Sequence, residues 1–409
     1  MTSSARNSET ISATLAITLL FLIAAMISQP VHAQTLTVLH NFNGFPDGRM
    51  PEAGLTLDGA GNLYGTTTYG GDPDCDNGAG CGTVFSLKHE TSGWILGVLQ
   101  TFTGTNGLYP LGRVVFGPDG ALYGTVAAGG PPPAFGLIFR LSLPPTICRS
   151  VSCPWTETQL YDFQNLSDGA QPESEVLFDQ TGSFYGTAEG GAGHGVVYKM
   201  TRSGSGWIYG VIYYFTGTPD GQGPIAGLTF DQAGNLYGTT WSGGAQNYGS
   251  VYELTPSDGS WQETVLHSFP SAGFVSPYAG VTLDQAGNLY GGTAANGGAN
   301  RETVYELSPA SGRFSTLNMI GNSVLADLSI DSAGNLYGTF SSDTFGECGE
   351  VFELSPQSGN WIYTTIHSFQ GSDGCQPAST VLMDANGNLF GTTTKGGTYN
   401  DGVVWEITP

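Results

Sequence analysis

Acidic side chains are the residues of this chain best suited to hold a metal ion. Carboxylate oxygens are the ligands that Ca²⁺ prefers in proteins. Each of four acidic residues lies four or six residues before a short Asp-containing turn that recurs along the chain: Glu52, Glu173, Glu175 and Asp327. If the segments that bear these turns converge, the four carboxyl groups form a negatively charged collar able to bind Ca²⁺.

A second set of residues combines aromatic rings with carboxylates in glycine-rich segments. Aromatic rings present apolar faces beside polar tips, and sugar binding uses such rings together with carboxylates. The candidate ligand-binding residues are Tyr69, Trp241, Tyr248 and Tyr278 for stacking, and Asp47, Asp168, Asp220 and Asp373 for hydrogen bonding. Both groups have a structural alternative, because Asp-Gly pairs form turns and aromatic rings also pack between sheets.

Motifs for nucleophilic catalysis do not occur in the sequence. There is no Gly-x-Ser-x-Gly phrase, which would mark a nucleophile elbow. His40, His267 and His367 occupy equivalent positions of a recurring segment, which indicates a structural role. The sequence therefore predicts a binding or scaffold protein rather than an enzyme. The alternative is a metal-assisted hydrolase or lyase with an acidic site at a channel mouth, whose ligands must converge from several segments.

The elements that position these residues are repeats of one unit. The phrase Leu-Tyr-Gly, with small changes, recurs at Tyr64, Tyr123, Tyr185, Tyr237, Tyr290, Tyr337 and Phe390. Its spacing of 47 to 62 residues suits a propeller blade of four strands. The high glycine content and the low content of charged residues agree with a turn-rich, all-β protein.

One unit shows the expected layout. Residues Ala279–Leu283 predict a first strand, Asp284–Asn288 a tight turn, Leu289–Gly291 the start of a second strand and Val304–Leu307 a third. The turn aspartates are expected to hydrogen-bond the local backbone. A fourth strand is marked in most units by a Trp that precedes a Phe by eight residues, and we expect a shorter or irregular strand near Arg313.

The two ends of the repeat array complement each other. The last unit stops after its third strand, Val403–Ile407, whereas Thr37–Phe42 near the start matches the fourth-strand segment Thr264–Phe269. The N-terminal strand is therefore expected to complete the last blade, and a closed ring leaves only short sheet edges. We predict one domain over residues 34–409, a seven-bladed β-propeller of four-stranded blades.

Two stretches carry a fuller motif. The form Gly-Leu-Thr-x-Asp-x-x-Gly-Asn-Leu-Tyr-Gly-Thr-Thr-x-x-Gly-Gly runs from Gly227 to Gly244, and Gly-x-Val-Tyr-Glu-Leu-Thr-Pro runs from Gly249 to Pro256. Similar stretches lie at 383–397 and 402–409. These units resemble the GloVer tandem repeat, and the resemblance covers all of residues 34–409. It implies a secreted bacterial β-propeller and transfers no catalytic residues.

The N-terminal segment predicts export. An apolar run over Leu15–Ile27 is followed by Val31-His32-Ala33, the pattern of a signal-peptidase site. We expect residues 1–33 to be a cleaved signal peptide, with an uncleaved membrane anchor as the alternative. The mature protein is expected to be secreted or periplasmic, with no membrane span.

Six cysteines agree with an oxidising compartment. They form three local pairs: Cys75 with Cys81, Cys148 with Cys153, and Cys348 with Cys375. We predict structural disulfides for these pairs, with redox-active thiols as the alternative.

The charge of the chain limits its partners. The formal net charge is −23 at pH 7, so nucleic acid is not expected to bind, because its binders carry basic patches. We expect a monomer that contacts an extracellular glycan, peptide or protein through the loops of one face.

Overall fold

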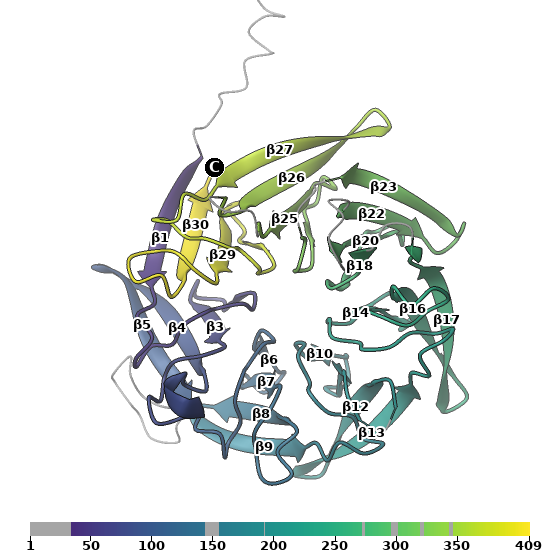
Figure 1. Ribbon diagram of the computed structural model, residues 1–409, viewed down its shortest axis with the longest axis horizontal. Helices are drawn as coiled ribbons and strands as arrows, with labels where there is room; N and C mark the ends of the chain where they lie inside the picture. The colour runs from purple at the N-terminus through teal and green to yellow at the C-terminus, as the bar shows by residue number, and fades with distance from the viewer. Residues whose placement is uncertain are drawn as a thin grey trace, which may run out of the picture.

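The repeated Leu-Tyr-Gly phrase forms the second strand of a four-stranded antiparallel sheet in every repeat. A computed structural model describes residues 34–143, 155–191, 193–271, 275–295, 302–319, 323–342 and 347–409. Seven such sheets surround a central channel (Figure 1). The predicted all-β, seven-bladed propeller is confirmed.

The first four blades follow each other around the ring in chain order. Blade 1 contains β2 (Thr56–Leu57), β3 (Leu63–Thr67), β4 (Thr83–Glu90) and β5 (Gly93–Thr101). Blade 2 contains β6 (Val115–Phe116), β7 (Leu122–Val126), β8 (Leu137–Ser142) and β9 (Thr156–Asp162). Blade 3 contains β10 (Leu177–Phe178), β11 (Phe184–Ala188), β12 (Val196–Ser203) and β13 (Gly206–Tyr214). Blade 4 contains β14 (Thr229–Phe230), β15 (Leu236–Thr240), β16 (Ser250–Ser257) and β17 (Ser260–Ser268).

The remaining blades include one with an extra bridge. Blade 5 contains β19 (Val281–Leu283), β20 (Leu289–Gly292), β22 (Thr303–Ser308) and β23 (Arg313–Met319), and β18 (Val275–Ser276) pairs with β21 (Ala294–Ala295) beside it. Blade 6 contains β24 (Ser329–Ile330), β25 (Leu336–Phe340), β26 (Glu350–Gln357) and β27 (Asn360–Ser368). Blade 7 contains β28 (Leu382–Met383), β29 (Leu389–Thr393), β30 (Val403–Thr408) and β1 (Thr35–Asn41). As expected, the outer strand β23 is short, with 7 residues against 9 in β17 and β27.

The turn between the first and second strands is closed by its aspartate. In blade 1, Asp58 Oδ1 accepts hydrogen bonds from the amides of Ala60 and Asn62, at 2.9 and 2.8 Å. Its Oδ2 accepts from Asn62 Nδ2 at 2.8 Å and from the Tyr64 hydroxyl at 3.1 Å. The same set recurs around Asp231, Asp284 and Asp331. The expected local role of these aspartates is confirmed.

Threonines of the second strands join six of the seven blades to the blade that follows. The Thr125 hydroxyl of blade 2 donates to the Ser174 carbonyl of blade 3 at 2.8 Å. Equivalent bonds run from Thr66, Thr187, Thr239 and Thr339. In blade 5 this threonine position holds Gly292. Ala279 was expected in the first strand of its unit, but its carbonyl accepts a hydrogen bond from the Thr239 hydroxyl of blade 4, and β19 begins at Val281.

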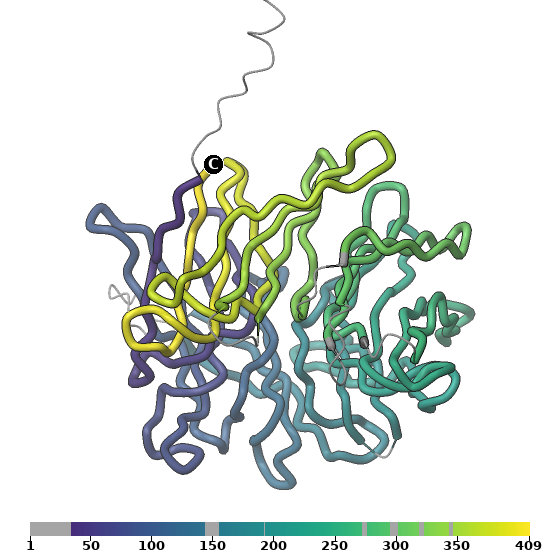
Figure 2. Tube along the Cα trace, turned by 45° about the horizontal axis from the view of Figure 1, so that its top comes forward, coloured from purple at the N-terminus to yellow at the C-terminus, as the bar shows by residue number. Residues whose placement is uncertain are grey.

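The ring is closed by β1, which pairs antiparallel with β30, with Thr35 opposite Thr408. Figures 1 and 2 show these two strands side by side although they come from opposite ends of the chain. The Thr392 hydroxyl of blade 7 donates to the Ala53 carbonyl of blade 1 at 3.2 Å, which continues the threonine pattern across the closure. The predicted completion of the last blade is confirmed.

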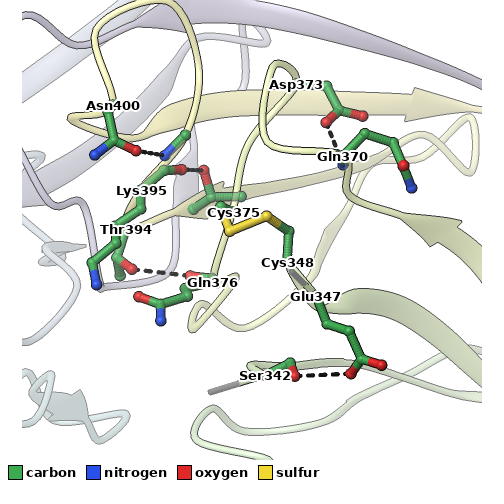
Figure 3. Close-up of a disulfide and its surroundings, with 12 residues drawn as sticks. Ser342, Glu347, Cys348, Gln370, Asp373, Cys375, Gln376, Thr394, Lys395 and Asn400 are labelled. Atoms are coloured by element: carbon green, nitrogen blue, oxygen red, sulfur yellow. Dashed lines mark hydrogen bonds between the residues drawn. A yellow bond between two sulfur atoms is a disulfide. The ribbon is translucent and has the colours of Figure 1, made fainter. Parts of the chain in front are cut away.

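Two of the three predicted disulfides lie among the described residues. Cys75 and Cys81 are bonded within the connection between β3 and β4. Cys348 lies before β26, and Cys375 lies in the connection from blade 6 to blade 7 (Figure 3). Cys375 also exchanges two backbone hydrogen bonds with Lys395, at 2.7 and 3.0 Å. Cys148 and Cys153 lie outside the described residues, as does the predicted signal peptide over residues 1–33.

Helical structure is almost missing from the described ranges. The single helical element that they contain is a 3-10 turn over Asp76–Gly78. In the same ranges, no helix has the length and apolar character needed to cross a membrane.

Candidate functional site

The channel wall is formed by three consecutive residues that lie close before each inner strand. We call the face with the β3–β4 type loops and the blade-to-blade connections the upper face. The first of the three residues forms an upper row around the channel: Glu52, Leu111, Glu173, Ile225, Tyr278, Leu325 and Ala378. The third forms a lower row: Gly54, Arg113, Glu175, Gly227, Gly280, Asp327 and Thr380. Apart from Gly280, the residues of both rows line one cavity of about 480 Å³.

Charged side chains cross the lower row. Arg113 Nη2 of blade 2 lies 3.4 Å from Glu175 Oε1 of blade 3. Asp327 Oδ1 of blade 6 accepts a hydrogen bond of 2.6 Å from the Gly280 amide of blade 5. A Cβ atom at Gly227 would lie 3.0 Å from Glu175 Oε1, and one at Gly280 would lie 3.0 Å from Asp327 Oδ1. The glycines of the lower row therefore make room for carboxylates that reach in from other blades.

The lower-row carboxyl groups influence each other. Burial and the negative charge of Glu175 raise the pKa of the Asp327 carboxyl, whereas the Gly280 amide and Arg113 act to lower it. Arg113 thus pairs with Glu175, and its positive charge also favours the ionised form of Asp327.

The two carboxyl groups of the upper row, by contrast, have no cation as a partner among the described residues. Neither Glu52 nor Glu173 forms an ion pair with any cation of the described ranges. Burial raises the pKa of the Glu52 carboxyl. Burial, together with the negative charges of Glu189 and Glu52, raises the pKa of Glu173 to about 7. The four carboxyl groups predicted as a collar therefore line one cavity, and of the four only Glu175 forms an ion pair with a cation of the described ranges.

Two of the predicted aromatic residues lie together at the upper rim. The ring centroids of Trp241 and Tyr278 are 6.1 Å apart, with 37° between the ring planes. Trp241 Nε1 donates a hydrogen bond of 3.1 Å to Glu189 Oε1. Tyr278 is 36 % exposed and belongs to the upper row of the cavity. Two blades thus contribute to this aromatic wall, which we define as Trp241 and Tyr278, and Glu189 of a third blade holds the indole ring.

A glycine allows the indole ring of Trp241 to lie where it does. Gly223 has φ of +66°, and a Cβ atom there would lie 2.1 Å from Trp241 Nε1. The Trp241 amide also donates to the Gly223 carbonyl at 3.1 Å. The close approach requires a residue without a side chain, so the position of the ring is set by the backbone beneath it.

The other two predicted stacking residues do not line the cavity. The Tyr69 ring packs against Tyr109, with centroids 5.1 Å apart, and the Arg49 guanidinium lies 5.6 Å from its centroid. Tyr248 is partly buried against the apolar cluster that contains Val281. Both rings make contacts between neighbouring parts of the propeller.

The four Asp-Gly aspartates hold the turns that follow the outer strands. Each carboxylate lies within 2.9 Å of a His or Tyr polar atom six or seven residues earlier: Asp47 with His40, Asp168 with Tyr161, Asp220 with Tyr213 and Asp373 with His367. Each also accepts a backbone amide hydrogen bond in its turn. These carboxylates are engaged within the fold. The same contact explains His40 and His367, whereas His267 stacks on Phe314, with ring centroids 4.0 Å apart.

Metal binding by the collar stays a prediction. Across the described stretches, no three or more His, Cys, Asp or Glu side chains are placed to hold one metal ion. Arg113 was not singled out from the sequence, although it stands in the same position as Glu175 and Asp327 within its unit. Alignment of the triplets before the inner strands is the signal that could have found it.

A closed ring of seven blades with a polar channel defines the class of this protein as a seven-bladed β-propeller. The chain belongs to the Gloeobacter/Verrucomicrobia repeat family, whose model matches residues 28–151, 146–324 and 262–409. The resemblance to the GloVer repeat is confirmed. No curated protein shows significant sequence similarity to the chain.

Solved structures share the fold at low sequence identity. A polysaccharide lyase of family PL25, an ulvan lyase, has a TM-score of 0.54 at 11% identity and covers 91% of this chain and 95% of its own. A putative 6-phosphogluconolactonase from Bacteroides uniformis has a TM-score of 0.52 at 13% identity and covers 83% and 88%. The extracellular domain of a putative hybrid two-component system from B. thetaiotaomicron has a TM-score of 0.53 at 12% identity and covers 91% and 39%. At these identities the likeness concerns the fold alone.

Proposed function

We propose that this protein is an extracytoplasmic binding propeller that takes a glycan at the upper mouth of its channel. The observation that carries the proposal is the aromatic wall: Trp241 and Tyr278 come from different blades and meet at the rim of a 480 Å³ cavity that also holds carboxyl groups. A ligand pocket of this size, with a few convergent polar groups, is typical of small-molecule and sugar sites.

The chemistry of the mouth suits a sugar ring. The faces of Trp and Tyr pack against the apolar C–H face of a sugar, while carboxylate oxygens accept hydrogen bonds from its hydroxyl groups. The hydrogen bond from Trp241 to Glu189 holds the indole in place before a ligand arrives. Such preorganisation improves affinity, because less side-chain freedom is lost on binding.

The disulfides support a location outside the cytoplasm. Both cysteine pairs among the described residues are bonded, and disulfides persist in oxidising compartments such as the periplasm and the extracellular space. The acidic net charge of −23 also favours neutral or cationic ligands over anionic ones.

The test is calorimetric titration of the purified protein with a panel of soluble oligosaccharides. We expect at least one to bind, and Tyr278→Ala and Trp241→Ala to weaken it about tenfold, in line with the loss of an aromatic contact. Tyr399→Ala is the matched control, because Tyr399 is 59 % exposed in the loop between β29 and β30 of the same face. Unchanged binding by both wall variants would overturn the proposal. Shortening of a bound oligosaccharide, read by mass spectrometry, would favour the hydrolase or lyase alternative.

A further inference from the structure

The balance of charge inside the channel differs between its two rows. In the lower row, Arg113 lies 3.4 Å from Glu175 and also lowers the pKa of Asp327. In the upper row, Glu52 and Glu173 have no such cation, and both are largely enclosed. The upper row therefore lacks a positive charge that the lower row already contains.

Besides Arg113, the described residues that line the cavity include one other basic residue. Lys395 lines it from blade 7, where it is exposed and held by its backbone to Cys375 (Figure 3). Its ammonium group is not within 4.0 Å of either upper-row carboxylate. The carboxyl groups of Glu52 in blade 1 and Glu173 in blade 3 thus have no ion-pair partner among the described residues, and a cation that approaches such enclosed groups stabilises their ionised form.

We propose that the glycan bound at the channel mouth carries a free, protonated amino group, and that this group enters the cavity between Glu52 and Glu173 while its sugar ring packs on Tyr278 and Trp241. This inference rests on the proposed function, because it names the chemical class of the ligand for the same site. The ligand class is an oligosaccharide of amino sugars without N-acetyl groups.

The placement of the rings agrees with a cationic sugar. Tyr278 belongs to the same row as Glu52 and Glu173, and the negative charges of Glu173 and Glu189 both reach its hydroxyl. An ammonium group near the face of Tyr or Trp is attracted by about 0.5–2 kcal/mol. The cavity of about 480 Å³ has room for one sugar residue and its first water molecules. A ligand whose sugar ring packs on the aromatic wall and whose amino group enters the cavity therefore contacts both the aromatic rings and the carboxyl groups.

The buried carboxyl groups also explain why a cation is favoured over a neutral ligand. Burial and the charges of Glu189 and Glu52 raise the pKa of Glu173 to about 7, so its ionised form is disfavoured in the empty cavity. An opposite charge within a few Å favours the ionised form. An N-acetyl group has no charge, so it cannot form an ion pair with either carboxylate.

The experiment compares two probes that differ in charge. Calorimetric titration of the purified protein uses glucosamine tetrasaccharide and N-acetylglucosamine tetrasaccharide at one pH and one salt concentration. We expect the free amine to bind at least tenfold more tightly. Glu173→Gln should reduce this preference about tenfold and leave the affinity for the acetylated probe unchanged. Glu52→Gln is a second variant with the same expectation, in case the first one does not fold.

The control variant removes one negative charge elsewhere. Glu90→Gln changes the net charge equally, but Glu90 is exposed in the hairpin between β4 and β5. We expect it to bind both probes as the unchanged protein does, because exposed charges farther apart than about 10 Å are screened at 0.1 M salt.

The possible results separate this inference from the proposed function. Equal or tighter binding of the acetylated probe, with no effect of Glu173→Gln and Glu52→Gln, overturns the amino-sugar inference and leaves glycan binding in place. Tighter binding of a trilysine peptide than of glucosamine tetrasaccharide overturns it in favour of a cationic peptide. If no member of the oligosaccharide panel binds, the proposed function fails together with this inference.

Discussion

The Asp327 carboxylate of blade 6 ends on the backbone of blade 5, where it accepts a hydrogen bond of 2.6 Å from the Gly280 amide. A second carboxylate, that of Glu175, lies beside the neighbouring lower-row glycine, Gly227. The lower row of the channel is therefore an arrangement in which charged side chains of some blades occupy the space left by glycines of others. The first prediction tests this arrangement.

Gly280→Ala should destabilise the propeller. The new Cβ atom would lie 3.0 Å from Asp327 Oδ1 and 3.0 Å from the Gly227 carbonyl oxygen, so one of them must move. Overpacking of this kind lowers the free energy of unfolding by about 1–3 kcal/mol, measured by denaturant titration. Gly59→Ala is the control, because a Cβ atom there meets nothing within 4 Å. Equal stability of the two variants would show that the lower row is not tightly packed.

Thr392→Val should weaken the closure of the ring. The variant keeps the shape of the side chain but leaves the Ala53 carbonyl without the hydroxyl that donates to it at 3.2 Å. Loss of one partner of a buried hydrogen bond lowers the free energy of unfolding by about 1–3 kcal/mol. Thr398→Val, at an exposed position of the same blade, should change stability by less than about 0.5 kcal/mol. A Thr392→Val protein as stable as this control would contradict the proposed role of the bond.

The two described disulfides should contribute unequally to stability. Cys348 and Cys375 are 27 residues apart, whereas Cys75 and Cys81 are 6 apart. On the chain-entropy relation, replacing the first pair by serines lowers the free energy of unfolding by roughly 3.5 kcal/mol and replacing the second by roughly 2 kcal/mol. Denaturant midpoints of the two double variants, measured under non-reducing conditions, give the order. The reverse order would mean that loop length does not decide the effect.

Glu173→Gln should stabilise the empty protein at alkaline pH. The folded-state pKa of Glu173 is about 7 because of burial and the charges of Glu189 and Glu52, against an ordinary value of 4.5. The folded protein therefore binds a proton more tightly than the unfolded chain, and stability is lost as pH rises from about 4.5 to about 7. At pH 8 the amide variant should be more stable by on the order of 1 kcal/mol, and at pH 4 the two should be alike.

Thermal unfolding at both pH values measures this difference. The control is Glu90→Gln, whose exposed side chain should leave the pH dependence unchanged. If Glu173→Gln and the unchanged protein have the same midpoint at pH 8, then Glu173 is not in a destabilising environment, and the charge argument for the upper row loses its support.

Several features could be predicted from the sequence because they depend on local and repeated patterns. The turn at Asp58 is closed by atoms no more than six residues apart, so its motif is visible in one unit. The match between Thr37–Phe42 and later outer-strand segments predicted the closure of the ring. In every blade the outer strand pairs with the third strand, and the last blade lacked an outer strand of its own.

The Asp-Gly aspartates show where local patterns were ambiguous. The sequence around Asp47 predicts a turn, but the same sequence would be seen whether the carboxylate faced a ligand or the protein itself. The structure places it 2.8 Å from His40 Nε2 and leaves it 6 % exposed. The side chain of His40, on the preceding strand, decides the orientation of the carboxylate. Neither a histidine nor an aspartate by itself indicates this contact.

By itself, the sequence determined the number of blades, the order of their strands and the way the ring closes, because each of these repeats with a period that can be read along the chain. Only the tertiary structure decided what the channel contains. Arg113, Glu175 and Asp327 come from three blades, and closure of the ring brings their side chains to one level. Trp241 and Tyr278 likewise meet only at the rim. The physical reason is that approach across a channel depends on the curvature of the whole ring, which no single unit encodes.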